Sequence, residues 1–313
     1  MSGPVDERSA STQNLGIAAI EVRNGRQTRI GELGILRVLP TKNRRTVGPW
    51  CFVDLMEAGD VDRPPPLEIG PHPHIGLATV TWLFTGTVLH SDSLGSEQLI
   101  RPGQLNLMTA GYGIAHAEEG VEVGPLDDTP IMGVQMWLAQ PDATRTGDSA
   151  FQHLDALPET HIGDSLATVF VGSHGGASSP ARVDHPAIGL DLTMGGPTVV
   201  PIDPGFEHAV VPIDRPVAVD DHITEPGSLA LVPVGRSELR LTARSHPARV
   251  MILGGRPLGE TVKMWWNFVA RTEDEITEAW SDWQTGNEER FGTVPSHLPR
   301  IEAPRPPWLR GDD

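Results

Sequence analysis

Short runs of apolar and β-branched residues, several of them alternating with polar residues and many bounded by Gly or Pro, recur along most of the chain. Such runs predict β-strands rather than helices. In the first half they lie at residues 17–22, 28–38, 50–56, 79–89, 98–108 and 131–139. In the second half they lie at residues 167–171, 190–194, 198–201, 209–213, 228–232, 238–242 and 249–253. The pattern predicts an all-β protein whose many short strands are joined by turns.

The two halves of the chain share a local pattern. The segment IRPGQLNLM at 100–108 resembles ITEPGSLALV at 223–232, and in both a Pro-Gly turn leads into an alternating strand. The stretch 141–158 is polar, which is typical of a linker. We therefore expect a loose arm at 1–14, an N-terminal domain at 15–140, a linker at 141–158 and a C-terminal domain at 159–313.

One helix is predicted at residues 272–284. Thr272 and Glu275 form a capping box, in which each side chain satisfies a backbone donor of the first turn. Gly286 can end the helix in a left-handed conformation. The apolar stripe of this helix consists of Ile276, Ala279, Trp280 and Trp283. We expect the stripe to dock on a barrel and the Pro-rich tail after Pro295 to run extended over the surface.

Composition narrows the function classes. The chain has 34 Gly and 29 Pro, as many turns require, and its net charge of −17 would repel the phosphates of nucleic acids. Its one cysteine, Cys51, excludes an internal disulfide framework and is read as a core residue. The first 30 residues lack the apolar core of a signal peptide, and no run is long enough to span a membrane. We expect a cytoplasmic protein without direct nucleic-acid or membrane partners.

Candidate metal ligands stand in two pairs, His72 with His74 and His116 with Glu118. Residues two apart on an extended strand point to the same side, so each pair can aim two ligand atoms at one point. With 12 histidines in the chain, one such pair could be chance. Two pairs that flank predicted strands instead indicate one metal ion at a barrel mouth. Three imidazoles and a carboxylate suit divalent iron, nickel, copper, manganese or zinc.

The sequence around these ligands resembles the pirin family of the cupin superfamily. HPHIGLATVT at 72–81 is similar to the family's H-P-H-R-G-F-E-T-V-T, and MTAGYGIAHAE at 108–118 is similar to its M-T-A-G-R-G-I-x-H-x-E. RTVGPW at 45–50 and GVQMWL at 133–138 extend the likeness. The resemblance implies two cupin (jelly-roll) barrels in tandem, with one iron(II) ion held by His72, His74, His116 and Glu118. The second barrel has Arg240 and Thr242 where the repeat would place ligands, so we expect no metal there.

Three positions depart from the family pattern. Ile75 stands in place of Arg, Ala78 in place of Glu, and Tyr112 in place of Arg. We expect all three near the metal, where the lost charges would change the substrate range.

Strand parity predicts the lining of a substrate pocket. If the side chains of His72 and His74 point inward, later residues of the same parity should share that side. These residues are Ala78, Val80, Trp82 and Phe84. Together with Tyr112 they would form an apolar pocket beside the metal. Ordinary barrel core is the alternative interpretation of Trp82 and Phe84.

Two functions remain open. The resemblance implies a quercetinase-like dioxygenase that opens a flavonol-type ring, with Glu118 as a candidate general base, and the apolar pocket favours such an aromatic substrate. The alternative is a metal-bound regulator that acts on protein partners through the redox state of its metal, which the lost charges at Ile75 and Ala78 favour. A cupin isomerase or lyase is a third interpretation, without a dedicated motif.

Overall fold

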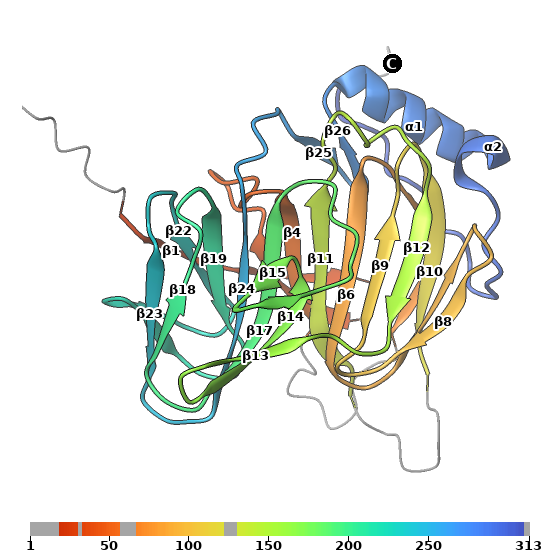
Figure 1. Ribbon diagram of the computed structural model, residues 1–313. Helices are drawn as coiled ribbons and strands as arrows, with labels where there is room; N and C mark the ends of the chain where they lie inside the picture. Colours follow the sequence, from red (N-terminus) through yellow and green to blue (C-terminus); the bar gives the residue numbers. More distant parts are fainter. Residues whose placement is uncertain (1–18, 31–32, 57–66, 122–129, 310–313) are drawn as a thin grey trace, which may run out of the picture.

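The computed structural model describes residues 19–30, 33–56, 67–121 and 130–309. Two antiparallel β-barrels lie side by side in this part of the chain, and two helices sit at one end of the first barrel (Figure 1). The predicted all-β class, with two jelly-roll barrels in tandem and a C-terminal helix, is confirmed.

The N-terminal barrel consists of a seven-stranded and a four-stranded sheet. The seven strands in spatial order are β12 (Ala150–Leu154), β9 (Leu105–Thr109), β6 (Leu77–Thr85), β11 (Met132–Ala139), β4 (Trp50–Met56), β3 (Leu33–Leu39) and β2 (Arg26–Ile30). The four strands are β5 (Glu68–His74), β10 (Ile114–Gly120), β7 (Val88–Asp92) and β8 (Glu97–Ile100).

The C-terminal barrel repeats this arrangement. Its seven strands are β1 (Glu21–Asn24), β22 (Ser228–Val232), β19 (Glu207–Pro212), β24 (Ala248–Gly255), β17 (Ala187–Met194), β14 (Ser165–Val171) and β13 (Glu159–Ile162). Its four strands are β18 (Thr198–Pro201), β23 (Glu238–Ala243), β20 (Val217–Val219) and β21 (His222–Thr224). A short hairpin, β15 (Ser173–His174) with β16 (Ala177–Ser178), is attached to this barrel.

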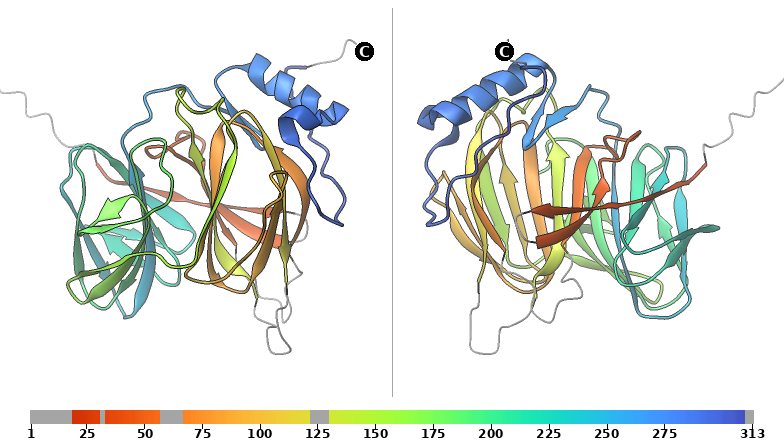
Figure 2. Two further views of the ribbon diagram at one scale, coloured as in Figure 1. Left: turned by 45° about the vertical axis from the view of Figure 1, so that its right-hand side comes forward. Right: turned by 180° about the vertical axis from the view of Figure 1, so that it is seen from behind.

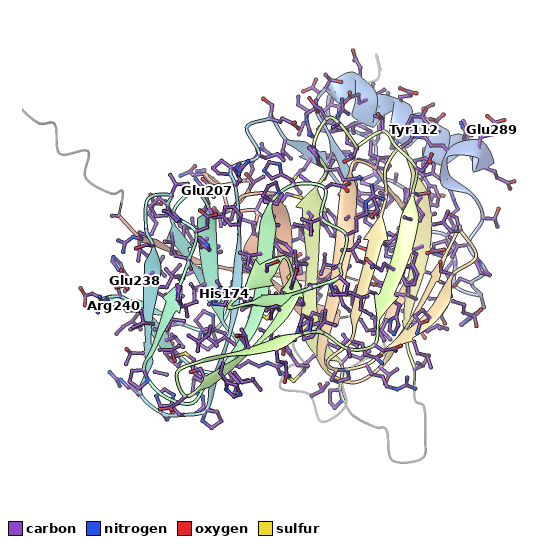
Figure 3. All side chains as sticks on the ribbon, in the orientation of Figure 1. Tyr112, His174, Glu207, Glu238, Arg240 and Glu289 are labelled. Atoms are coloured by element: carbon purple, nitrogen blue, oxygen red, sulfur yellow. The ribbon has the colours of Figure 1, made fainter. Side chains whose placement is uncertain are left out.

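The internal repeat found in the sequence corresponds to equivalent strands. β9 follows one Pro-Gly turn and β22 follows the other, and each is the second strand of its seven-stranded sheet. The side chains of β23 alternate strictly, with Leu239 and Leu241 in the core and Arg240 exposed on the outer side of the barrel (Figure 3). Among the described residues, both groups of His, Asp, Glu or Cys side chains close enough to hold a metal lie in the N-terminal barrel.

The barrels exchange their edge strands, which changes the domain boundaries that we predicted. β1 precedes the N-terminal barrel in sequence but pairs with β22 of the other barrel, and the N-terminal segment crosses from one barrel to the other (Figure 2). β12 lies within the predicted linker 141–158, yet it pairs with β9 and completes the N-terminal sheet. A polar edge strand cannot be told from a linker by its composition. The arm predicted at 1–14 lies outside the described residues.

The seven-stranded sheets pack against each other through a shared apolar core. Trp82 lies in the middle of this contact, where its ring stacks on Phe170 at 5.4 Å between ring centroids. Its indole Nε1 donates a hydrogen bond of 2.8 Å to Asp191, which is also paired with Arg249. Burial of large rings on both sides stabilises the association of the barrels.

The C-terminal segment leaves the second barrel and covers the first. It forms a hairpin, β25 (Lys263–Trp265) with β26 (Phe268–Ala270), then α1 (Glu273–Thr285), α2 (Glu288–Phe291) and a tail without regular structure. Phe268 bridges to Ile75, and the amide of Ile301 donates to the carbonyl of Pro71. The C-terminal domain expected at 159–313 therefore includes a segment that packs on the N-terminal barrel (Figure 1).

Helix α1 has the predicted caps. Thr272 and Glu275 form the capping box, and Gly286 ends the helix with a φ of 71°. Trp283 is buried and donates its indole N–H to the carbonyl of Ile301, while Trp280 is only partly buried. No helix in the described ranges is both long and apolar enough to cross a membrane.

Candidate metal centre

The four predicted ligands lie on two neighbouring strands. In the pairing of β5 with β10, His72 stands opposite His116, and a bulge between His116 and Glu118 shifts the register. All four side chains are buried. The alternation of each strand therefore turns the His72–His74 pair and the His116–Glu118 pair into the same barrel interior.

Three of the four ligands come together in one group. Single ring nitrogens of His72, His74 and His116 lie within 4.8 Å of one another, and the Nε2 atoms of His74 and His116 are 3.0 Å apart. Two nitrogens bound to one ion at about 2.1 Å lie roughly 3.0–3.4 Å apart, so this spacing fits two ligands of one metal. Glu118 forms a second group with His116 and with His90, a residue that the sequence analysis did not single out.

Backbone carbonyls fix the protonation of two imidazoles. Nδ1 of His72 lies 2.9 Å from the carbonyl oxygen of Gly70, and Nδ1 of His74 lies 3.2 Å from that of Asn267. A carbonyl oxygen only accepts, so each Nδ1 carries the proton and each Nε2 keeps a free lone pair. The lone pair of the His74 Nε2 points at His116, as metal binding requires.

Burial sets the charge of the cluster. It lowers the pKa of His72 to about 4 and the pKa values of His74 and His116 well below their usual range. It raises the pKa of Glu118. Three neutral imidazoles beside a buried carboxyl form a donor set that suits a divalent transition metal.

A cavity of about 400 Å³ opens from the cluster. Trp137 stands edge-on to the His74 ring at 5.3 Å and stacks on Phe52 at 3.9 Å. The guanidinium of Arg37 lies 4.3 Å above the Phe52 ring and makes two hydrogen bonds of 2.7 Å to Asp54. An aromatic wall thus runs from the candidate ligands to the ion pair of Arg37 and Asp54.

Polar groups of the cavity lie near Glu118. The hydroxyl of Thr81 is 2.9 Å from Oε1 of Gln135 and 3.5 Å from Oε1 of Glu118. These side chains can position a polar substituent of a bound small molecule next to the candidate metal-binding residues.

The predicted pocket lining was wrong for Ala78, Val80, Trp82 and Phe84. Ala78, Val80 and Trp82 belong to the core between the barrels, and Phe84 packs against that core beneath Arg249. Gly76, with a φ of 65°, turns the chain between β5 and β6, which belong to different sheets. Strand parity does not continue through such a turn, so Thr81 faces the cavity instead.

The three departures from the family pattern also lie outside the cavity lining. Ile75 is buried among Phe268 and other side chains of the C-terminal segment. Tyr112 is 46% exposed, with its ring under Arg290, and lies beside the C-terminal helices (Figure 3). The charges missing at Ile75, Ala78 and Tyr112 therefore do not line this cavity.

The C-terminal hairpin supplies cavity residues that the sequence analysis missed. Trp266 and Asn267 occupy its turn, and Trp266 has a φ of 52°, a conformation that a bulky residue rarely adopts. The carbonyl of Asn267 orients His74 across 193 positions of sequence. No local spacing could have indicated this contact.

Two tandem jelly-roll barrels, one of which holds a buried histidine cluster, define a bicupin with a candidate metal centre. The family model described as Pirin matches residues 32–138, and the model described as Pirin C-terminal cupin domain matches residues 188–292. A "Pirin-like protein" of Caulobacter vibrioides is 34% identical over 276 residues, which cover 85% of this chain and 93% of the relative. This chain belongs to the pirin family.

Other relatives carry the name of an activity. A Pseudomonas aeruginosa protein named "Putative quercetin 2,3-dioxygenase" is 38% identical over 281 residues, which cover 89% of this chain and 87% of the relative. The crystal structure of a quercetin 2,3-dioxygenase from Acinetobacter baumannii matches with a TM-score of 0.84 and 37% identity, over 92% of this chain and 96% of that one.

Proposed function

We propose that this protein is an iron(II)-dependent dioxygenase that opens the ring of a flavonol-type, quercetin-like substrate. The observation that carries the proposal is the cluster of neutral imidazoles at one end of an aromatic-walled cavity of about 400 Å³. This volume lies within the usual range of small-molecule sites, roughly 300–1,000 Å³. The names of the relatives described above support the same reaction class.

His72, His74 and His116 would hold the metal, with Glu118 as the fourth ligand or as a nearby base. Bound there, a divalent iron ion supplies Lewis-acid activation of a substrate hydroxyl and redox chemistry with dioxygen. The raised pKa of Glu118 suits a carboxylate that takes a proton from a phenolic hydroxyl.

The remaining cavity residues bind and orient the substrate. Trp137 and Phe52 offer stacked ring faces and edges to a flat aromatic ligand. Thr81 and Gln135 can hydrogen-bond a substrate hydroxyl close to Glu118. Trp266 and Ile301 from the C-terminal segment complete the apolar lining and reduce access of water.

The alternative function is a non-enzymatic, metal-bound redox regulator that acts through protein partners. The sequence argument for it was the loss of charge at Ile75 and Ala78. Neither side chain lines the cavity, so that argument no longer favours a regulator.

Oxygen uptake tests the proposal. Protein reconstituted with iron(II) is mixed with a panel of flavonols and catechols, and His116→Ala serves as the control without a complete ligand set. We expect uptake with at least one flavonol in the wild type and none in the variant. Metal binding without uptake on any compound would contradict the dioxygenase and support the regulator.

A further inference from the structure

At the Nδ1 side of His116, opposite the nitrogen that faces His74, two more buried polar side chains form a hydrogen-bonded chain. We infer that His90 and Asp92 are positioning residues that hold the proton of His116 on Nδ1 and so keep its Nε2 free for the metal. The inference rests on the proposed metal centre and adds to it residues that lie outside the ligand set.

The chain begins at a carboxylate held by the backbone. Asp92 is fully buried, and its Oδ1 accepts hydrogen bonds from the amides of Leu94 at 2.9 Å and Ser96 at 3.0 Å. Burial opposes ionisation of Asp92, but hydrogen bonds from His90 and Ser96 outweigh it and lower its pKa. The ionised Oδ2 remains as an acceptor, 3.1 Å from Nε2 of His90.

The acceptor Oδ2 of Asp92 decides which ring nitrogen of His90, and then of His116, carries the proton. Because Asp92 accepts, Nε2 of His90 donates, and a neutral His90 then has a free lone pair on Nδ1. Nδ1 of His116 lies 3.4 Å from Nδ1 of His90, so it donates to that lone pair.

The tautomer of His116 determines whether its Nε2 can bind a metal in the ligand cluster. With its proton on Nδ1, His116 presents an unprotonated Nε2 to the unprotonated Nε2 of His74 at 3.0 Å. Two lone pairs at this distance repel each other unless a cation lies between them. With the opposite tautomer, His116 would instead donate a hydrogen bond to His74 and close the cluster without a metal.

The surrounding strands hold this arrangement in place. β10 pairs with β7 so that His116 stands opposite Asp92 and Glu118 opposite His90. The ring of His90 stacks on Phe151 of β12 at 4.4 Å with an interplanar angle of 11°. The exchanged edge strand therefore supports the ring that orients a metal ligand.

The test is Asp92→Asn, which keeps the shape of the side chain. The side-chain oxygen of the Asn keeps the hydrogen bonds from the backbone amides of Leu94 and Ser96. Its side-chain nitrogen then donates a hydrogen bond to His90. This donation reverses the direction of the hydrogen bonds, so that Nδ1 of His90 donates to Nδ1 of His116. The proton of His116 then lies on Nε2. We expect ¹⁵N NMR of histidine-labelled apoprotein to show this change of tautomer, and zinc(II) affinity to fall about 10–100-fold.

Two further variants sharpen the test. Asp191→Asn removes the charge of a buried aspartate at the barrel contact, and we expect it to leave both the tautomer and the zinc(II) affinity unchanged. His90→Phe keeps a ring against Phe151 but removes the acceptor, so His116 should populate both tautomers.

The outcomes separate the two proposals. If His116 keeps its Nδ1 proton in both Asp92→Asn and His90→Phe, the positioning role is overturned. Affinity lost equally in Asp92→Asn and Asp191→Asn would also overturn it, because the effect would then be one of general stability. Failure of the wild type to bind zinc(II) would overturn the metal centre instead, while the tautomer of the apoprotein still decides the role of the chain.

Discussion

At the scale of single residues, proton positions decide what the histidine cluster can bind. Carbonyl oxygens of Gly70 and Asn267 place the protons of His72 and His74, and both are backbone atoms. The spacing of the sequence could point to the candidate ligands, because parity on one strand is a local property. It could not locate these carbonyls, because tertiary packing brings them to the rings.

The first prediction concerns Ala78, which faces the contact between the barrels and is 7% exposed. Ala78→Glu would force a carboxylate into this closely packed contact, so we expect it to destabilise the protein by about 3–5 kcal/mol. Zinc(II) affinity should stay unchanged. Thermal melting and metal titration check both points, and Ala78→Gln separates charge from volume. A rise in flavonol turnover in Ala78→Glu would show that the residue faces the metal after all.

The second prediction concerns pH and the imidazoles. Unfolded histidine titrates near pH 6.5, but folded His72 does so only near pH 4, and His74 and His116 also resist protonation. Below pH 6.5 the unfolded chain therefore binds more protons, and the stability of the apoprotein falls until the folded pKa values are reached. Each such proton contributes about 1.4 kcal/mol per pH unit.

Thermal melting of apoprotein between pH 7 and 5 measures this effect above the range of ordinary carboxyl groups. We expect a steady loss of stability as pH falls, and a smaller loss in His72→Gln. An equal loss in the wild type and in His72→Gln would mean that the His72 imidazole is not held neutral.

At the scale of elements, the turn between β5 and β6 decides which side chains face the candidate metal centre. The sequence predicted β4 and β18 with their observed bounds, because β4 is a continuous apolar run and β18 alternates between buried and exposed residues. It failed for the pocket lining, because Gly76 separates two strands that belong to different sheets. A pattern of period two carries no information beyond such a break.

The third prediction concerns this glycine. Gly76 has a φ of 65°, and an added Cβ would lie 2.1 Å from the carbonyl oxygen of Val269 in β26. Gly76→Ala should therefore push the C-terminal hairpin away from His74, lowering both the melting temperature and the zinc(II) affinity. Gly95→Ala is the matched control, since Gly95 has a φ of 85° with no atom within 4 Å of an added Cβ. If both substitutions had the same effect, backbone strain at a positive φ would be the cause, and the contact with Val269 would play no part.

At the scale of the whole molecule, the candidate metal site depends on segments that lie far from its ligands in the sequence. β12 supports the ring of His90, and the hairpin after the second barrel orients His74 and lines the cavity. The repeat predicted two related halves and the family resemblance implied two barrels, but neither predicted the exchanged edge strands or the return of the C-terminal segment. These features arise from packing between distant segments, and the local pattern of a polar strand or a Trp-rich hairpin does not record its partner.

The most direct test of this account is the metal content of the purified protein after reconstitution with iron(II). Elemental analysis should find about one ion per chain in the wild type, because the described residues offer one connected set of ligands. His116→Ala should hold almost none while its apoprotein keeps a melting temperature close to that of the wild type. Two ions per chain, no ion in the wild type, or full retention in His116→Ala would contradict the metal centre described here.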